Sequence, residues 1–165
     1  MNAAYQPDNL PYQVTIHFYK PFDFLSHAVY YLGTIARYDL LYTHCSLQLD
    51  DSVYDIDCFS FSNYNAALLH SIRPPITSIT LPLSLEDYDT LIVRLSSIQA
   101  SKARIHLRDL LAMALHLDTE PYSFNCASFI VYCLSGVFPP SYITPLDLYT
   151  FLLEQTCSVP NAIVI

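Results

Sequence analysis

Residues Leu40–Phe59 read LLYTHCSLQLDDSVYDIDCF, and this stretch decides the architecture expected for the chain. Runs rich in apolar, aromatic and β-branched side chains flank the acidic pair Asp50-Asp51. That pattern predicts two antiparallel strands, Leu40–Leu49 and Ser52–Phe59, joined by a tight turn.

His44 lies in the first of these strands and faces a carboxylate in the second. Directly opposed residues of an antiparallel pair point to the same face of the sheet. With the turn centred near Leu49-Asp50, His44 opposes Asp55; with the turn one residue later, it opposes Asp57. Either register brings an acid beside the imidazole, although strand aspartates more commonly occupy a solvated face.

A second stretch, Tyr122–Gly136, reads YSFNCASFIVYCLSG. Ser123 or Asn125 can cap a helix here, which leaves Cys126 in the first turn, where unpaired backbone N–H groups and the helix dipole favour a thiolate. The same N–H groups can receive an oxyanion. A cysteine in an apolar helix is more often a core residue, and that is the role we expect for Cys133.

The rest of the pattern predicts one α+β domain over residues 1–165, a small antiparallel sheet packed against helices. Further strands are expected at Val14–Tyr19 and at Ile76–Leu83, where Pro82 indicates an edge position or the strand's end. Helices are expected from Asp23 or Ser26 to about Arg37, from Ser84 to about Ala103, from Leu107 to about His116, and from Thr144 to about Gln155. The chain breaks at Arg73-Pro74-Pro75, and no element is predicted between Phe59 and that break.

Composition argues against several classes of function. The net charge is −8 with 7 scattered Lys and Arg residues, which argues against a nucleic-acid surface. The 2 isolated glycines form no phosphate loop, and the 5 cysteines lack zinc spacing, so we expect no cofactor and no metal. Without a signal-peptide or membrane-spanning pattern, we expect reduced thiols, a cytoplasmic location (the host cytoplasm for a phage protein) and no stable membrane insertion.

The order of the two stretches resembles that of a known superfamily. THCSLQLDDSVYDI, followed later by FNCASFIVYCLSG, resembles the circularly permuted branch of the NlpC/P60 papain-like superfamily, in which the histidine strand precedes the cysteine helix. That branch includes the H-box and NC proteins, which are lecithin:retinol acyltransferase-like and H-rev107-like. VTIHFYKPFDFLSHAVYYLGTIARYDLLYTHCSL and SYITPLDLYTFL resemble the bacterial and phage version, so the resemblance extends over most of the chain.

The resemblance implies a permuted papain-like fold in which Cys126 matches the nucleophile and His44 the base. VYDI matches the position of the third residue, which favours Asp55 over Asp57. The chain departs from the family in its turn, LDDS, where glycines are usual. It also has Ala127 where H-rev107-like proteins carry an acidic residue, which argues against a phospholipid acyltransferase.

Together these residues predict a cysteine hydrolase that cleaves an amide or peptide bond, or a thioester or ester, in a protein, peptide or acyl substrate. In this hypothesis His44 takes the proton of Cys126, Asp55 holds the imidazole, and an acyl-enzyme forms. Acyl transfer through the same intermediate is one alternative. Another is a non-catalytic protein-binding or inhibitor module on the same fold, phage-encoded modules included, which the acidic charge and 14 tyrosines would suit.

Overall fold

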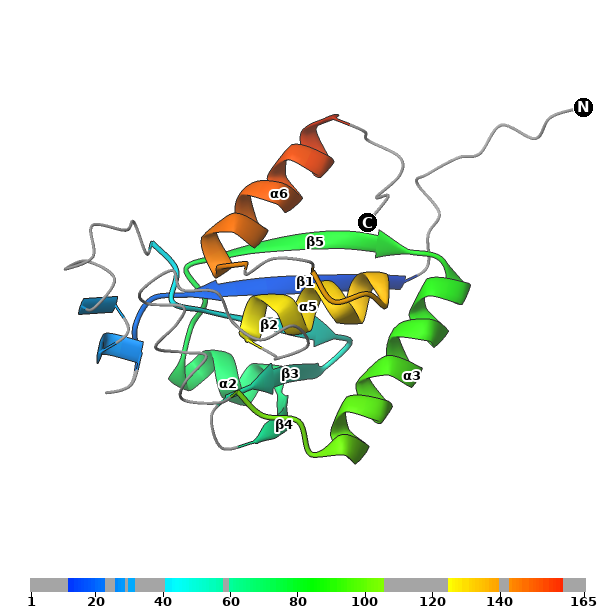
Figure 1. Cartoon of the computed structure of the whole chain (residues 1–165), viewed down its shortest axis with the longest axis horizontal. Coiled ribbons are helices and arrows are strands. Elements are labelled where there is room, and N and C mark those ends of the chain that lie inside the picture. The colour runs from blue at the N-terminus through cyan, green and yellow to red at the C-terminus, as the bar shows by residue number, and fades with distance from the viewer. Residues whose placement is uncertain are drawn as a thin grey trace, which may run out of the picture.

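A single antiparallel sheet forms the centre of the molecule (Figure 1). A computed structural model describes residues 12–22, 26–28, 30–31, 41–57, 60–105, 125–139 and 143–158. Within these residues five strands pair in the order β4-β3-β2-β1-β5, and every neighbouring pair is antiparallel. The strands are β1 Tyr12–Tyr19, β2 His44–Leu49, β3 Ser52–Ile56, β4 Phe61–Asn65 and β5 Thr77–Leu83. The helices are α2 Ala66–Ile72, α3 Leu85–Ser101, α5 Cys126–Ser135 and α6 Pro145–Ser158.

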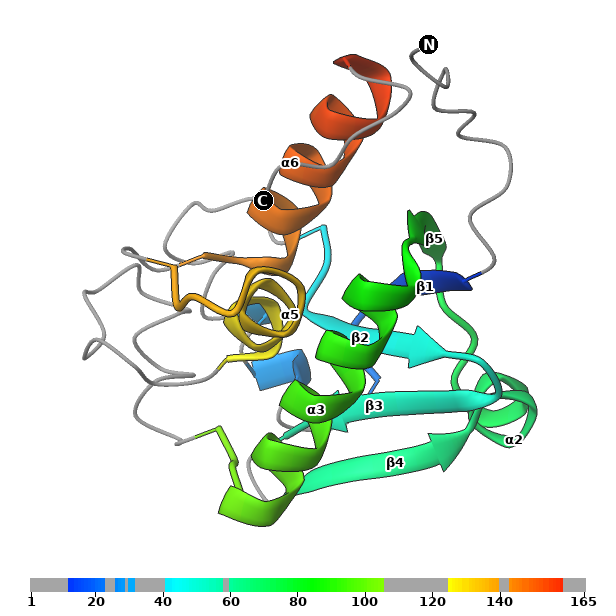
Figure 2. The ribbon, with the colours of Figure 1, turned by 90° about the vertical axis from the view of Figure 1, so that its right-hand side faces the viewer.

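One face of the sheet is apolar and forms the core with α3, α5 and α6. Because side chains alternate along a strand, every second residue of β1, β2 and β5 points to this face. The buried residues of this core include, from the strands, Val14, Ile16, Phe18, Leu47 and Leu81 and, from the helices, Leu95, Phe129, Ile130 and Leu152. Figure 2 shows α5 on one side of the sheet and α2 on the other.

The opposite face is polar and lies against α2. His17 of β1 hydrogen-bonds through Nε2 to Oε1 of Gln48 and through Nδ1 to Oγ of Ser78, both at 2.7 Å. Gln48 donates its own N–H to the carbonyl of Asp50, which orients the amide and assigns the His17 proton to Nε2. The ring of His70 in α2 meets His17 edge-on. Burial lowers the pKa of His17, so at neutral pH it is an uncharged link between strands.

Most of the predicted elements are present near their predicted bounds. The α+β class is confirmed, and so is the hairpin, because Leu49 pairs with Ser52 across the acidic turn. β5 lies at an edge of the sheet, as Pro82 indicated. Ser84 caps α3 and Asn125 caps α5.

Two elements, β4 and α2, were absent from the sequence prediction, which is wrong in this stretch. β4, FSNYN, is a short edge strand without an apolar alternation, and α2, AALLHSI, buries only Ala66. β3 ends at Ile56, whereas the predicted strand ran to Phe59; Cys58 and Phe59 lie outside the described residues. The N–H of Asp57 donates to the carbonyl of Ser60.

Other predictions fall wholly or partly outside the described residues. Of the helix expected from Asp23 or Ser26 to Arg37, residues 26–28 and 30–31 are described, and they are helical. The helix expected at Leu107–His116 lies outside them altogether.

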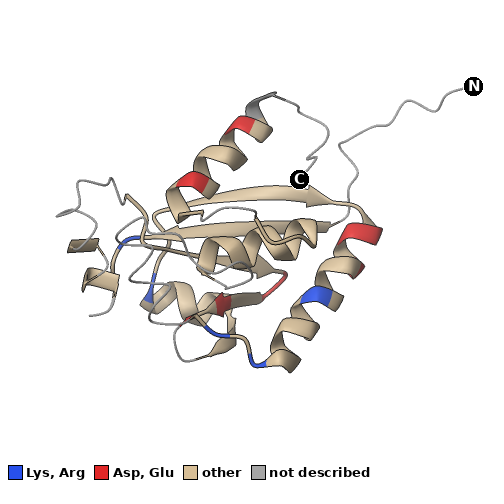
Figure 3. Cartoon of the chain, in the orientation of Figure 1, with Lys and Arg blue, Asp and Glu red and all other residues tan. Residues whose placement is uncertain are grey.

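The charged residues and the helices bear on possible partners. In Figure 3 the Lys and Arg residues of the described part of the chain fall at separate places along it, in α3 and in connecting segments. In this part of the chain, no helix combines the length and the apolar character needed to cross a membrane.

The C-terminal end of α5 is held by one arginine and one glycine. Nη1 of Arg94 in α3 donates to the carbonyls of Cys133 and Leu134 at 2.8 and 2.7 Å. Gly136 then ends the helix with a φ of 78°, and its N–H donates to the carbonyl of Tyr132. A Cβ on Gly136 would lie 2.6 Å from Nη2 of Arg94.

We therefore expect Gly136→Ala to lower the free energy of unfolding by about 1–2 kcal/mol, because a side chain disfavours the left-handed conformation. Displacement of Arg94 adds to this loss. Urea unfolding followed by circular dichroism measures the effect. Gln99→Ala, at an exposed position of α3, is the control and should change the free energy by no more than about 0.5 kcal/mol. Equal unfolding midpoints for Gly136→Ala and the wild type would contradict the expectation.

Candidate active site

Cys126 is the first residue of α5, and the local sequence holds it there. The Asn125 side chain accepts a hydrogen bond from the N–H of Ser128 at 2.8 Å, and the Ser128 hydroxyl accepts one from the N–H of Asn125 at 2.8 Å. This capping box fixes the start of the helix. Asn125 also donates through Nδ2 to the carbonyl of Ile143 at 3.2 Å, which ties the helix start to the segment before α6. The Cys126 side chain is buried, at 1% exposed.

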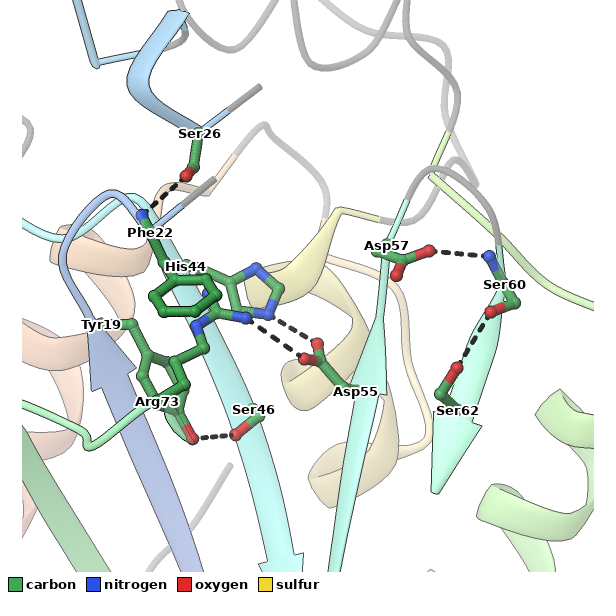
Figure 4. Close-up of polar contacts among 10 residues, drawn as sticks. All are labelled: Tyr19, Phe22, Ser26, His44, Ser46, Asp55, Asp57, Ser60, Ser62 and Arg73. Carbon is green, nitrogen blue, oxygen red and sulfur yellow. Dashed lines mark hydrogen bonds and ion pairs between the residues drawn. The ribbon is translucent and has the colours of Figure 1, made fainter. Parts of the chain in front are cut away.

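His44 is the first residue of β2, and its imidazole contacts Asp55 of β3. The distance from Nε2 of His44 to Oδ1 of Asp55 is 2.5 Å (Figure 4). The two side chains are 12% and 10% exposed, so water has little access to the contact. A carboxylate therefore lies beside this imidazole, as the sequence predicts.

The register of the hairpin does not by itself select this acid. Leu49 pairs with Ser52, and this register corresponds to the later of the two predicted turn positions. Continued along the strands, it sets His44 opposite Asp57. The imidazole instead reaches diagonally to Asp55, which lies two residues from Asp57 on the same face of the sheet. Diagonal neighbours on one face are within reach of aromatic and long side chains.

The other aspartate, Asp57, contacts Ser60, the residue before β4. Its Oδ1 accepts a hydrogen bond from the N–H of Ser60 at 2.7 Å. In Figure 4 its carboxylate points to Ser60 and away from His44. Of the two aspartates that the sequence left open, Asp55 is the one in hydrogen-bond contact with the imidazole.

The thiol of Cys126 lies in contact with Cys45 and His44. Its hydrogen bond with the Cys45 side chain, followed by the charge and hydrogen bond of His44, lowers the pKa of Cys126 well below its ordinary value, although burial opposes this. Burial, and then the contact with Cys126, raises the pKa of Cys45 well above its ordinary value. Cys45 therefore stays a thiol, and its S–H donates to the thiolate of Cys126.

The pKa of His44 moves in the opposite direction. Burial disfavours the imidazolium, but the charges of Asp55 and Cys126 and the hydrogen bonds to both outweigh it and raise the pKa to about 10. Because Nε2 faces Asp55, Nδ1 is the ring nitrogen left for Cys126. Both shifts favour the charged form of the pair, a thiolate and an imidazolium.

Arg73 and Tyr19 also belong to the site, and the sequence pattern indicates neither of them. Nη1 of Arg73 lies 3.7 Å from Oδ2 of Asp55, and its Cζ lies 4.4 Å from the centroid of the Tyr19 ring. The Tyr19 hydroxyl hydrogen-bonds to Oγ of Ser46 at 3.0 Å. In the sequence Arg73 marks only a break before two prolines, and its proximity to Asp55 depends on α2, which has no recognisable pattern.

Cys133 differs from Cys126 although both lie on α5. It is fully buried, and burial raises its pKa well above the ordinary value, opposed only in part by Arg94. It is a core thiol, as predicted. Among the described residues, no three His, Cys, Asp or Glu side chains gather as metal ligands would.

No protein-family model matches the chain, and a search of curated proteins finds no match.

The ionisation of Cys126 can be measured directly. We expect the ultraviolet absorbance of its thiolate, taken as the difference between the wild type and Cys126→Ala, to appear well below the ordinary thiol pKa of about 8.5. Cys45→Ala should move this transition to higher pH, because the S–H donor is lost. Cys133→Ala, which removes a buried thiol from the same helix, should leave it unchanged. A Cys126 transition at the ordinary pH would contradict the ion pair.

The same pair makes a particular contribution to stability as pH changes. In the unfolded chain the histidine loses its proton near about pH 6.5 and the cysteine near about pH 8.5. In the folded chain His44 keeps its proton up to about pH 10, whereas Cys126 has already lost its own at lower pH. Between about pH 6.5 and 8.5, both states hold one proton on the pair, so its contribution is flat.

We therefore expect a plateau with a fall on each side. Below the plateau the unfolded chain holds more protons, so the contribution falls as pH falls; above it the folded chain holds more, so the contribution falls as pH rises. The measurement is the free energy of unfolding of the wild type minus that of the double variant His44→Gln/Cys126→Ala across this pH range. A steady slope through this range would show that the folded pair does not hold one proton there. A neutral thiol and imidazole also hold one proton, so the thiolate absorbance, and not this profile, identifies the ion pair.

Proposed function

We propose that this chain is a cysteine hydrolase with a circularly permuted papain-like fold. It cleaves an amide or peptide bond, or a thioester or ester, through an acyl-enzyme on Cys126. The observation that carries the proposal is the imidazole of His44, which hydrogen-bonds to Cys126 on one side and to Asp55 on the other. A nucleophile, a base and an acid that orients the base, joined in one row, are what nucleophilic catalysis requires.

Two features of the fold support the proposal. The histidine strand precedes the cysteine helix along the chain, the order of the permuted branch. The helix packs on the sheet so that its first residue, Cys126, meets the first residue of β2, His44. The base and the nucleophile therefore lie on rigid elements rather than on loops.

In the first half of the reaction the thiolate of Cys126 attacks the carbonyl carbon of the substrate. The electron pair of the carbonyl moves to its oxygen, and the first N–H groups of α5, those of Cys126 and Ala127, are suited to hold the oxyanion, because a helix leaves them without an intrahelical acceptor. The imidazolium of His44 then gives its Nδ1 proton to the leaving group. The scissile bond breaks, and a thioester with Cys126 remains.

In the second half water resolves this thioester. The now neutral His44 takes a proton from water, and the resulting hydroxide attacks the thioester carbonyl. The carbon–sulfur bond breaks, which restores the thiolate of Cys126 beside the imidazolium and releases the acid. Asp55 keeps Nε2 protonated in both halves, so Nδ1 is the nitrogen that exchanges protons with substrate and water.

Because Cys126 is buried, a small acyl donor is the substrate to test first. We expect a small activated ester or thioester to leave an acyl group on Cys126, seen as a mass increase of the intact protein and located by peptide mapping. Cys126→Ala should give no adduct, and His44→Ala should slow acylation by about 10²–10⁴-fold, because the group that stabilises the thiolate and protonates the leaving group is lost. Cys133→Ala should react like the wild type.

The products separate the competing functions. Release of the free acid supports hydrolysis, whereas transfer to an added amine or alcohol in preference to water would show an acyltransferase. Equal turnover by the wild type and Cys126→Ala would end the proposal, and so would the absence of any adduct across ester, thioester and peptide donors.

A further inference from the structure

We propose that Arg73 is a positioning residue of this site: its guanidinium, seated over the ring of Tyr19, holds Oδ2 of Asp55 so that Oδ1 remains on His44. The consequence for turnover rests on the proposed hydrolase, but the positioning itself is a property of the folded chain. Arg73 stands outside the row of Cys126, His44 and Asp55 and pairs with its last member.

The geometry gives each oxygen of Asp55 a different partner. Oδ1 lies 2.5 Å from Nε2 of His44, and Oδ2 lies 3.7 Å from Nη1 of Arg73. Figure 4 shows the imidazole and the guanidinium side by side, both directed at this carboxylate. A carboxylate held at both oxygens cannot rotate about its terminal bond without losing one partner.

Arg73 is itself held in place by its backbone and by aromatic rings. Its N–H donates to the carbonyl of Leu69 at 2.7 Å as α2 ends, and the following Pro74 disfavours a helical backbone at Arg73, whose φ and ψ are −133° and 80°. The guanidinium lies 4.4 Å from the Tyr19 ring and 5.6 Å from the Phe22 ring. Arginine suits such a seat because its planar group stacks on aromatic faces while it pairs with an acid.

The position of Arg73 also balances the charge of a buried cluster. The thiolate of Cys126, the imidazolium of His44, the carboxylate of Asp55 and the guanidinium of Arg73 alternate in sign and sum to zero. The Arg73 side chain is 14% exposed, so water screens it little. Burying a charge is costly unless it is paired, so loss of Arg73 leaves an excess negative charge that opposes the thiolate. Among the described residues, Tyr19 from β1 and Cys45 from β2 are the other titratable groups that face this cluster.

A purely structural role predicts something different. If Arg73 only packed between α2 and the sheet, its loss would lower the stability of the fold and leave the ionisation of Cys126 unchanged. A positioning role predicts that two substitutions have different effects. Lysine keeps the positive charge but cannot stack as a planar group on the Tyr19 ring, whereas glutamine removes the charge.

The test compares Arg73→Gln and Arg73→Lys with the wild type in two measurements, the thiolate titration of Cys126 without substrate and its acylation by a small ester. We expect Arg73→Gln to move the titration to higher pH and to slow acylation by up to about 100-fold, as misplaced catalytic groups do. Arg73→Lys should keep the titration near that of the wild type and slow acylation less. Arg104→Gln, the same substitution at an exposed arginine, is the control and should change neither measurement.

A double-mutant cycle checks that Arg73 acts through Asp55. In an Asp55→Asn background, Arg73→Gln should slow acylation several-fold less than it does in the wild type, because the carboxylate is already gone. An unshifted titration in Arg73→Gln, or equal effects in both backgrounds, would overturn the proposal. Because the titration needs no substrate, it tests Arg73 even if no donor acylates Cys126. Conversely, acylation that Arg73→Gln leaves unchanged overturns the role of Arg73 and keeps the hydrolase.

Discussion

The contact between His44 and Asp55 is the constraint on which the rest of the site depends. It joins β2 to β3 through side chains, so the two-residue turn and the strand register must both be right before it forms. It also fixes which nitrogen of the imidazole remains for the thiol, because Nε2 is occupied. A hydrogen bond between oppositely charged groups, shielded from water, is stronger than the same contact on the surface. The direction of the His44 pKa shift and the choice of ring nitrogen follow from this pair, and the charge of His44 then acts with the Cys45 hydrogen bond to lower the pKa of Cys126.

The site draws on both layers of the fold. The apolar face of the sheet supports α5, which carries Cys126 to the end of β2, whereas the polar face supports α2, whose end carries Arg73. His44 and Asp55 belong to the sheet between them. A site built across a sheet in this way needs both faces to be formed, so packing of the apolar core and hydrogen bonding on the polar face jointly determine its geometry. The hydrogen bonds of the buried His17, which join β1 to β2 and β5, are part of the hydrogen bonding on the polar face.

Sequence reasoning reached the parts of the site that local patterns encode. The hairpin, the cap at Asn125 and the position of Cys126 in a first turn follow from residue types at short spacing. The choice between Asp55 and Asp57 does not, because the register favours Asp57 while the imidazole reaches diagonally to Asp55. Arg73 was out of reach for a different reason: a helix as short as α2, with one buried residue, has no periodicity to detect. Tertiary contacts between segments of that kind can be read only from the folded chain.

Within α5 the chain provides its own comparison of what makes a thiol reactive. Cys126 and Cys133 are both buried, and burial by itself disfavours a thiolate at either position. At Cys133 burial prevails, because the thiol lies near the helix C-terminus, where the dipole also opposes negative charge. At Cys126 the S–H of Cys45, the imidazolium of His44 and the helix N-terminus act together against burial and overcome it. Two cysteines with almost equal exposure therefore carry opposite pKa shifts, which means that the surrounding donors and charges, and not burial, distinguish the two thiols of this helix.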